Sequence, residues 1–90
     1  MELIHDKVNC RFTLKINDQI AKVDYVLKEN TMLLTYAQVP KSLSGQGYGK
    51  VLVEKTFEKL TSEGYKAVAI CGFVKTIAKR SDKWKNIIQH

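Results

Sequence analysis

Three glycines that alternate directly before a helical segment constrain this chain more than any other feature. Gly45, Gly47 and Gly49 lead into residues 48–63, where apolar side chains recur with helical spacing at Val53, Thr56, Phe57 and Leu60. Glycine tolerates left-handed backbone, so the N–H groups of such a loop can point into one concavity beside the helix N-terminus. That arrangement binds phosphate or pyrophosphate without a charged side chain. The sequence therefore predicts an anion-binding loop, and the alternative is a glycine-rich turn that only reverses the chain.

The spacing of the glycines excludes two well-known phosphate-binding loops. A P-loop needs Gly-x-x-x-x-Gly-Lys-Ser/Thr, but Lys50 is followed by Val51 and Gly45 stands one position too late. A dinucleotide fingerprint needs Gly-x-Gly-x-x-Gly after the first strand of a parallel sheet. In this chain the glycines alternate, and the segment before them has the pattern of an antiparallel sheet.

The first forty residues predict an antiparallel meander. Residues 8–16 alternate with period two, so Val8, Cys10, Phe12, Leu14 and Ile16 are expected on one buried face. Residues 20–27 and 31–39 form the second and third expected strands, joined by turns at Asn17–Gln19 and Glu29–Asn30. Pro40 ends the third strand because it cannot donate to a sheet ladder.

The second half of the chain predicts a βαβ crossover. Gly64 marks the end of the helix, and residues 67–71 form a short apolar run that is typical of a strand covered on both faces. Such a crossover makes the last two strands parallel. A short helix is expected over residues 73–80, with one or two further helical turns in residues 81–90. The expected fold class is α/β (α+β), a β-meander joined through the crossover, in one domain of residues 1–90.

Charge and apolar content limit the partners. The net charge of +6 falls entirely in residues 41–90, which carry ten basic and four acidic side chains. This half attracts polyanions such as nucleic acid, acidic lipid or a nucleotide cofactor, unless the lysines are only a solvated surface. No apolar run approaches the length of a membrane span, and the acidic N-terminus lacks a signal core, so a cytoplasmic protein is expected. Cys10 and Cys71 are expected to be reduced thiols. The protein is expected to be a monomer or a weak dimer.

The residues around the glycine loop resemble those of a known family. The segment from Gln38 to Val53 resembles the pyrophosphate-binding motif of the GNAT superfamily of N-acetyltransferases, Arg/Gln-x-x-Gly-x-Gly/Ala. The run Cys71-Gly72-Phe73-Val74 resembles the Cys-Pro-Phe-Val stretch of a group of very short GNAT-like proteins. The likeness spans roughly residues 8–84 and implies a minimal GNAT-like fold that binds acetyl-CoA, or coenzyme A itself.

The resemblance implies a role for each matching position. The strand before the loop is expected to splay from its parallel neighbour, with the pantetheine arm in the gap. The cofactor-binding residues would be Gln38, Val39 and Pro40 at the gap, Gly45, Gln46, Gly47, Tyr48, Gly49 and Lys50 around the pyrophosphate, and Gly72 and Phe73 beside the cofactor. Cys71 would lie near the thioester. Three positions depart from the family pattern. Ser44 stands where the motif has Arg or Gln. Gln38 stands where family members often have Glu, and Ile77 stands where Tyr is common.

Several catalytic assignments follow, and they stay open at this stage. Cys71 is the best catalytic candidate, either accepting the acetyl group or protonating the leaving thiolate, although the role of a small hydrophobic side chain at the end of a buried strand is favoured over both. His5, Asp24, Tyr25 and Tyr36 are weaker candidates. The predicted activity is acetyl transfer to an amine of unknown identity, for which an open site favours a macromolecule. The alternatives are a coenzyme A-binding protein without catalysis, and a basic nucleic-acid-binding module that no recognisable motif supports. No metal is expected.

Overall fold

Tight turns fold the first part of the chain into antiparallel strands. The computed structural model describes residues 1–90, with β2 at Arg11–Ile16, β3 at Gln19–Lys28 and β4 at Thr31–Gln38. Asn17 and Asp18 have φ of 48° and 65°, the backbone that a two-residue hairpin needs, and Glu29 has φ of 56° in the next turn. The predicted meander and both turns are therefore confirmed.

A strand that the sequence pattern did not indicate precedes the meander. β1 (Leu3–Asp6) pairs antiparallel with β2, and a turn over Lys7–Cys10 joins them. In this turn Asn9 donates to the Asp6 carboxylate from its side chain (2.9 Å) and its backbone (3.1 Å), which also holds the pKa of Asp6 below its usual value. The expected strand over residues 8–16 thus begins at Arg11. Val8 is 91% exposed, so its predicted inward orientation is wrong.

The crossover gives the sheet its parallel pair. After β4 come the short 3₁₀ helix η1 (Lys41–Leu43), α1 (Tyr48–Ser62), β5 (Lys66–Ala69) and α2 (Gly72–Arg80). The strand order is β1-β2-β3-β4-β5, and only β4 and β5 are parallel, as predicted. Gly64, with φ of 87°, ends α1 in a Schellman arrangement, in which the N–H groups of Gly64 and Tyr65 bond to Thr61 and Leu60.

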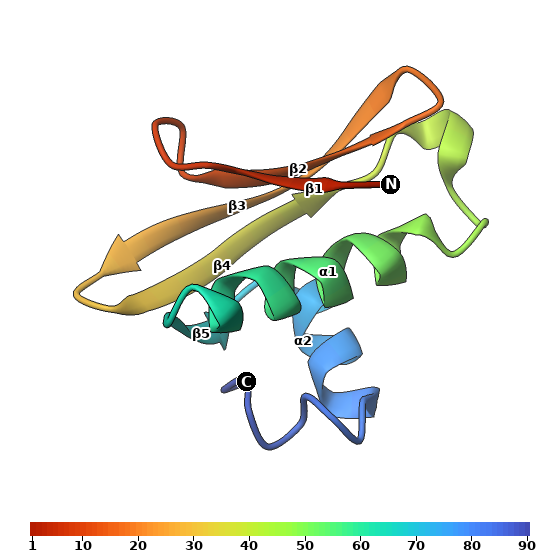
Figure 1. Cartoon of the computed structure of the whole chain (residues 1–90). Coiled ribbons are helices and arrows are strands. Elements are labelled where there is room, and N and C mark those ends of the chain that lie inside the picture. Colours follow the sequence, from red (N-terminus) through yellow and green to blue (C-terminus); the bar gives the residue numbers. More distant parts are fainter.

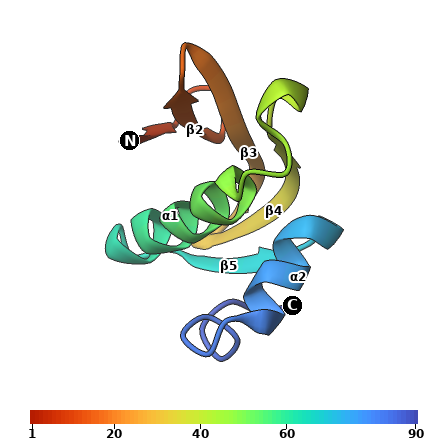
Figure 2. The same cartoon turned by 90° about the vertical axis from the view of Figure 1, so that its right-hand side faces the viewer.

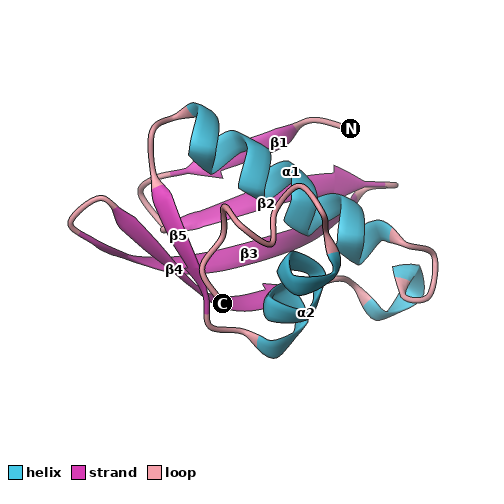
Figure 3. Ribbon diagram, turned by 90° about the horizontal axis from the view of Figure 1, so that it is seen from below, coloured by secondary structure: helices cyan, strands magenta, loops and turns pink.

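Both helices pack on the same face of the sheet (Figures 1 and 2). Alternate strand residues such as Phe12, Leu14, Val23 and Leu34 meet Leu52, Val53, Phe57 and Leu60 of α1 in one buried core. Seen from below, α1 crosses the strands while α2 lies near β4 and β5 (Figure 3). Neither helix has the length and apolar content that crossing a membrane requires.

The opposite, outer face of the sheet carries no helix. Ile70 is 50% exposed and Val68 is only partly buried. The prediction that residues 67–71 are covered on both faces is therefore wrong, because the chain has too few helices to cover the sheet twice.

The C-terminal residues close the edge of the sheet rather than extend α2. Ala69 donates to the Gln89 carbonyl at 2.7 Å and Gln89 donates to Ala67 at 3.1 Å, which makes a parallel bridge beside β5. Trp84 and Ile88 are buried, and one helical hydrogen bond joins them, so the predicted helical turns are present only in part.

Candidate functional site

The strands β4 and β5 separate halfway along β4. Their last paired residues are Leu34 and Ala69, after which the N–H groups of Ile70 and Cys71 both donate to the Leu34 carbonyl, at 3.0 and 2.9 Å. The chain then turns into α2. The last four residues of β4, Thr35 to Gln38, are flanked by β3 on one side and by no strand on the other. We call residues 35–38 the open segment. An open strand edge offers backbone donors and acceptors to an extended ligand.

A β-bulge lies at the start of the open segment. The register between β3 and β4 shifts so that Tyr25 pairs with Leu34 and Asp24 with Tyr36, and Thr35 is left without a partner. The extra residue reverses the faces of the residues that follow it. Tyr36 is consequently 47% exposed on the outer face instead of being a core residue. No signal in the sequence marks this bulge.

The glycine loop leads into α1 with left-handed backbone at two positions. Gly45 has φ of 78°, and Gly47, which caps α1, has φ of 83°. No side chain caps α1, because the Ser44 hydroxyl bonds to Lys41 and the Gln46 amide to Ser42. The N–H groups of the first helical turn are therefore available to an anion, with the helix dipole directed at it.

Gly49 is distinguished by its surroundings and not by a left-handed backbone. It lies inside α1, and a Cβ at this position would stand 2.5 Å from Cζ of Phe73, so the absence of a side chain lets the aromatic ring of α2 cross the first turn of α1. The sequence pattern does not distinguish Gly49 from Gly45 and Gly47. Only the packing of the two helices separates Gly49 from the other two.

A cavity of about 650 Å³ opens between the first turn of α1 and α2. Its walls carry two basic side chains, Lys50 and Arg80, and two acidic ones, Glu54 and Asp82. The remaining lining residues are Gly47, Gly49, Phe73, Thr76, Ile77 and Ser81. Of the predicted cofactor-binding residues, the fold brings Gly47, Gly49, Lys50 and Phe73 to this cavity, together with Ile77. The other predicted residues do not line it: Gly45, Gln46, Tyr48, Gln38, Val39, Pro40 and Gly72.

Cys71 lies where the two strands part. It forms the N-cap of α2, is partly buried against the core and carries a free thiol. Its N–H bonds to Leu34, directly before the open segment. Gln38, Val39 and Pro40 are at the far end of that segment, where β4 leads into η1. Cys71 and Gln38 therefore mark the two ends of the same opening.

His5 belongs to a different part of the molecule. Its Nδ1 lies 2.7 Å from Oε1 of Glu63, just past the end of α1, and its Nε2 lies 2.7 Å from the Tyr25 hydroxyl. The ring stacks on Phe12 with centroids 4.3 Å apart and is 4% exposed. α1 is about 22 Å long at 1.5 Å per residue, so His5 is distant from the glycine loop. These contacts tie β1 and β3 to the end of α1.

The comparisons with known proteins agree with this architecture. A family model described as GCN5-related N-acetyl-transferase matches residues 11–87, and the chain therefore belongs to that family, within the GNAT superfamily. The NMR solution structure of a GCN5-like protein from Staphylococcus aureus superposes with a TM-score of 0.71. It is 23% identical, and the alignment covers 97% of this chain and 86% of that one, which shows a shared fold. No curated protein gives a significant match.

The contact between Gly49 and Phe73 predicts a coupled effect of two substitutions. Gly49→Ala should destabilise the protein by about 1 kcal/mol at most, because the new methyl group displaces the Phe73 ring, which is 48% exposed and can move, while alanine favours the helix. Adding Phe73→Ala should remove most of that penalty. Urea unfolding of the two single variants and the double variant measures the coupling free energy, expected at about 0.5 kcal/mol. Additive losses would show that Gly49 is not needed for this contact.

The buried phenol of Tyr25 predicts a pH-dependent stability. Burial raises the pKa of Tyr25 above 10.0, and the neighbouring Cys10, Tyr65, Glu63 and Asp6 raise it further. A pKa that is higher in the folded than in the unfolded protein contributes stability that is complete below about pH 10 and is lost as the pH rises through the folded value.

Tyr25→Phe should therefore flatten the fall in the free energy of unfolding above pH 10, although it also removes the hydrogen bond to His5 and lowers stability at neutral pH by about 1 kcal/mol. Urea unfolding followed by circular dichroism at several pH values measures both effects. Tyr36→Phe, at an exposed tyrosine, is the matched control and should keep the wild-type slope. Parallel curves for wild type and Tyr25→Phe would contradict the prediction.

Proposed function

We propose that this protein binds acetyl-CoA and transfers its acetyl group to an amine. The observation that carries the proposal is that an open strand edge and an uncapped, glycine-rich helix N-terminus lie at the two ends of one connection, residues 39–47. Members of the GNAT superfamily generally use acetyl-CoA, which has an extended amide-containing arm and a pyrophosphate. The open segment suits the arm, and the glycine loop suits the pyrophosphate.

The residues present fit this ligand through their backbone more than through their side chains. The pyrophosphate would be held by the N–H groups from Gly45 to Lys50, with Gln46 and Tyr48 contributing as loop positions. The Lys50 side chain lines the same cavity, but its Nζ lies 4.0 Å from Oε1 of Glu54. The carboxylate of Glu54 therefore competes with a bound phosphate for the charge of Lys50. Arg80 adds a second cation to the cavity. Loss of the family's Arg/Gln at Ser44 therefore leaves the backbone cradle in place.

The pantetheine arm would run along the open segment toward Cys71. Backbone groups of residues 35–38, together with Val39 and Pro40, would line one side, and the chain from Ile70 to Phe73 the other. Acetyl transfer needs a neutral amine and a proton for the departing thiolate. Cys71, at the point where β4 and β5 part, is the residue that we propose for the second task; a covalent acetyl-cysteine is the alternative route.

A coenzyme A-binding protein without catalysis is the second candidate. Gln38 cannot act as a general base and Ile77 cannot act as an acid, and both are positions where the family often has a titratable side chain. Ile77 lines the cavity, so its chemistry bears directly on the site. Ligand binding and turnover must therefore be measured separately.

Coenzyme A binding is the first test. On titration with coenzyme A and acetyl-CoA, the amide NMR signals of residues 45–50 and 71–73 should shift. Lys50→Ala and Arg80→Ala should each raise the Kd about tenfold, since a hydrogen bond to a charged group contributes about 1.5 kcal/mol. Lys15→Ala removes an exposed lysine elsewhere and should leave the Kd unchanged. If no ligand binds at millimolar concentration, the glycine loop is not an anion-binding site and only reverses the direction of the chain.

Cys71→Ala separates binding from turnover. The variant should bind coenzyme A as the wild type does, because the loop contacts are untouched. Release of free thiol from acetyl-CoA, measured with a panel of primary amines, should fall by about 10²-fold or more if the thiol donates the proton. Turnover equal to wild type would show that Cys71 only fills space at the end of β5.

A further inference from the structure

The outer face of the sheet carries an apolar row that crosses three strands. Val26 of β3 pairs with Leu33 of β4, which pairs in turn with Val68 of β5. Leu34 and Ala69, which follow the last two residues in the chain, are buried in the core, so by alternation the row projects from the outer face. Val26 is 54% exposed, and the other two are partly buried. The row lies directly before the point where β4 and β5 part.

Two exposed side chains extend this surface to the opening. Tyr36, on the open segment, is 47% exposed, and Ile70, the first residue after the last pair of β4 and β5, is 50% exposed. The opening therefore has different chemistry on its two sides. The helices and the cavity between them lie on one side, and apolar side chains that no helix covers lie on the other. Such groups suit the side chains of a polypeptide that approaches from the outer face.

Two lysines flank the next outward position of the sheet. Thr31 of β4 pairs with Lys28 of β3 on one side and with Lys66 of β5 on the other. Both lysine side chains are exposed, and neither takes part in an ion pair. They stand two residues along their strands from the apolar row, which is about 7 Å. The surface thus joins apolar groups at the opening to two free cations farther from it.

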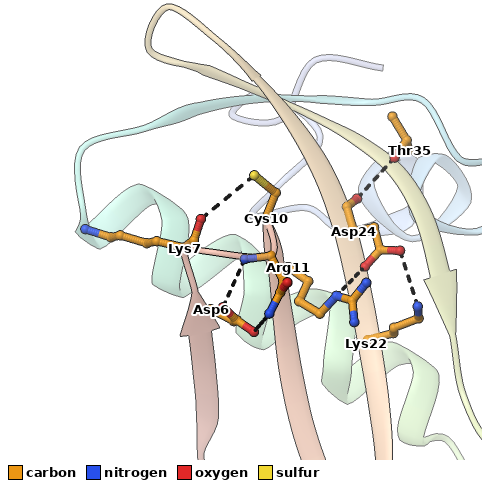
Figure 4. Close-up of polar contacts among 8 residues, drawn as sticks. Asp6, Lys7, Cys10, Arg11, Lys22, Asp24 and Thr35 are labelled. Atoms are coloured by element: carbon orange, nitrogen blue, oxygen red, sulfur yellow. Dashed lines mark hydrogen bonds and ion pairs between the residues drawn. The ribbon is translucent and has the colours of Figure 1, made fainter.

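The remaining charges leave the outer face positive (Figure 4). Oδ1 of Asp24 lies 3.1 Å from Nε of Arg11, and its Oδ2 lies 3.4 Å from Nζ of Lys22. In all, the outward positions of the strands carry Arg11, Lys15, Lys22, Lys28 and Lys66, against only Asp6 and Asp24. A second copy of the chain on this face would bring like charges together, and a polyamine would be repelled. The face is therefore complementary to an anionic partner.

We propose that the acetyl acceptor is a lysine in an acidic, apolar segment of another protein, and that this segment docks on the outer face beside the opening. The inference rests on the proposed function, in which the thioester lies beside Cys71. Apolar side chains of the segment pack on Val26 and Ile70, and its carboxylates pair with Lys28 and Lys66. The acceptor lysine reaches the thioester through the opening, past Ile70.

The rise of a strand sets the spacing within the segment. Lys66 precedes Ile70 by four residues, a distance of about 13 Å along a strand. In an extended segment the carboxylates therefore stand about four positions from the acceptor lysine. They all lie on one side of it in the sequence, because the two free lysines lie on one side of the opening.

The transfer balances with the groups named. The acceptor ammonium loses one proton to water, and the neutral nitrogen attacks the thioester carbonyl. The new C–N bond forms as the C–S bond breaks. The Cys71 thiol gives its proton to the departing thiolate and recovers the second proton that the nitrogen loses. The products are a protein with an N-acetyl-lysine and coenzyme A with a free thiol.

The test compares blocked peptides in which a single lysine is the only amine. Two peptides carry a pair of glutamates about four positions before or after the lysine, with valine and leucine between. Their controls have glutamine in place of glutamate. With acetyl-CoA, one of the glutamate peptides should exceed its control about fivefold in kcat/KM, and high salt should remove the difference, because exposed ion pairs are weak and screened. Spermidine, a free polyamine, should be a poorer acceptor than either glutamate peptide.

Matched variants locate the docking surface. Lys28→Glu and Lys66→Glu should abolish the preference for glutamate, whereas Lys15→Glu should keep it. Val26→Ser should raise the KM for the peptide without changing the Kd of coenzyme A, and Val8→Ser, at an exposed turn residue, should change neither. In amide NMR, the peptide should shift the signals of Val26 and its two neighbours in the apolar row, whether or not coenzyme A is bound.

The outcomes separate this inference from the proposed function. Coenzyme A binding together with equal use of glutamate and glutamine peptides, or with better use of spermidine, overturns the inference and leaves the proposed function intact. So does self-association, or binding to anionic vesicles, that shifts the signals of the apolar row while the peptides do not. A protein that binds no coenzyme A overturns both.

Discussion

The architecture depends on one carbonyl oxygen. Leu34 accepts the N–H groups of both Ile70 and Cys71, and this double contact ends the pairing of β4 with β5. A carbonyl that serves two successive N–H groups cannot continue a ladder, because the chain that donates them is already turning. The same turn starts α2 at Gly72 and carries Phe73 onto Gly49. The opening along β4 and the cavity between the helices therefore have one structural origin.

The second constraint is that the helices cover a single face. A chain of 90 residues supplies α1 and α2 for one side, and the other side of the sheet is left to polar and half-exposed residues. The bulge at Thr35 turns Tyr36 to that side, next to Asp24 and Lys22. One face of the sheet thus carries the core and both helices, and the other carries the ion pairs of Asp24 with Arg11 and Lys22.

Sequence reasoning succeeded where local rules decide the structure. Asn17, Asp18 and Gly64 adopt the left-handed backbone expected of them, and the apolar stripe from Val53 to Leu60 is buried as predicted. It failed at β1, because Leu3–Asp6 is too short for a recognisable period, and at Val8, because the turn held by Asp6 and Asn9 interrupts the alternation. It also wrongly predicted that residues 67–71 are covered on the outer face of the sheet. An apolar run does not reveal how many helices the chain has to cover the sheet.

The sequence by itself determined the order of the elements after β1, the parallel last pair, the family and the place of the glycine loop, because each depends on residues adjacent in the chain. Only the tertiary structure decided which end of α1 His5 contacts, why Gly49 lacks a side chain, and where β4 parts from β5. These features arise between segments far apart in sequence, such as Gly49 with Phe73 or Lys22 with Tyr36. Contacts of that kind depend on the crossing of packed elements and on a single inserted residue, and neither leaves a local pattern.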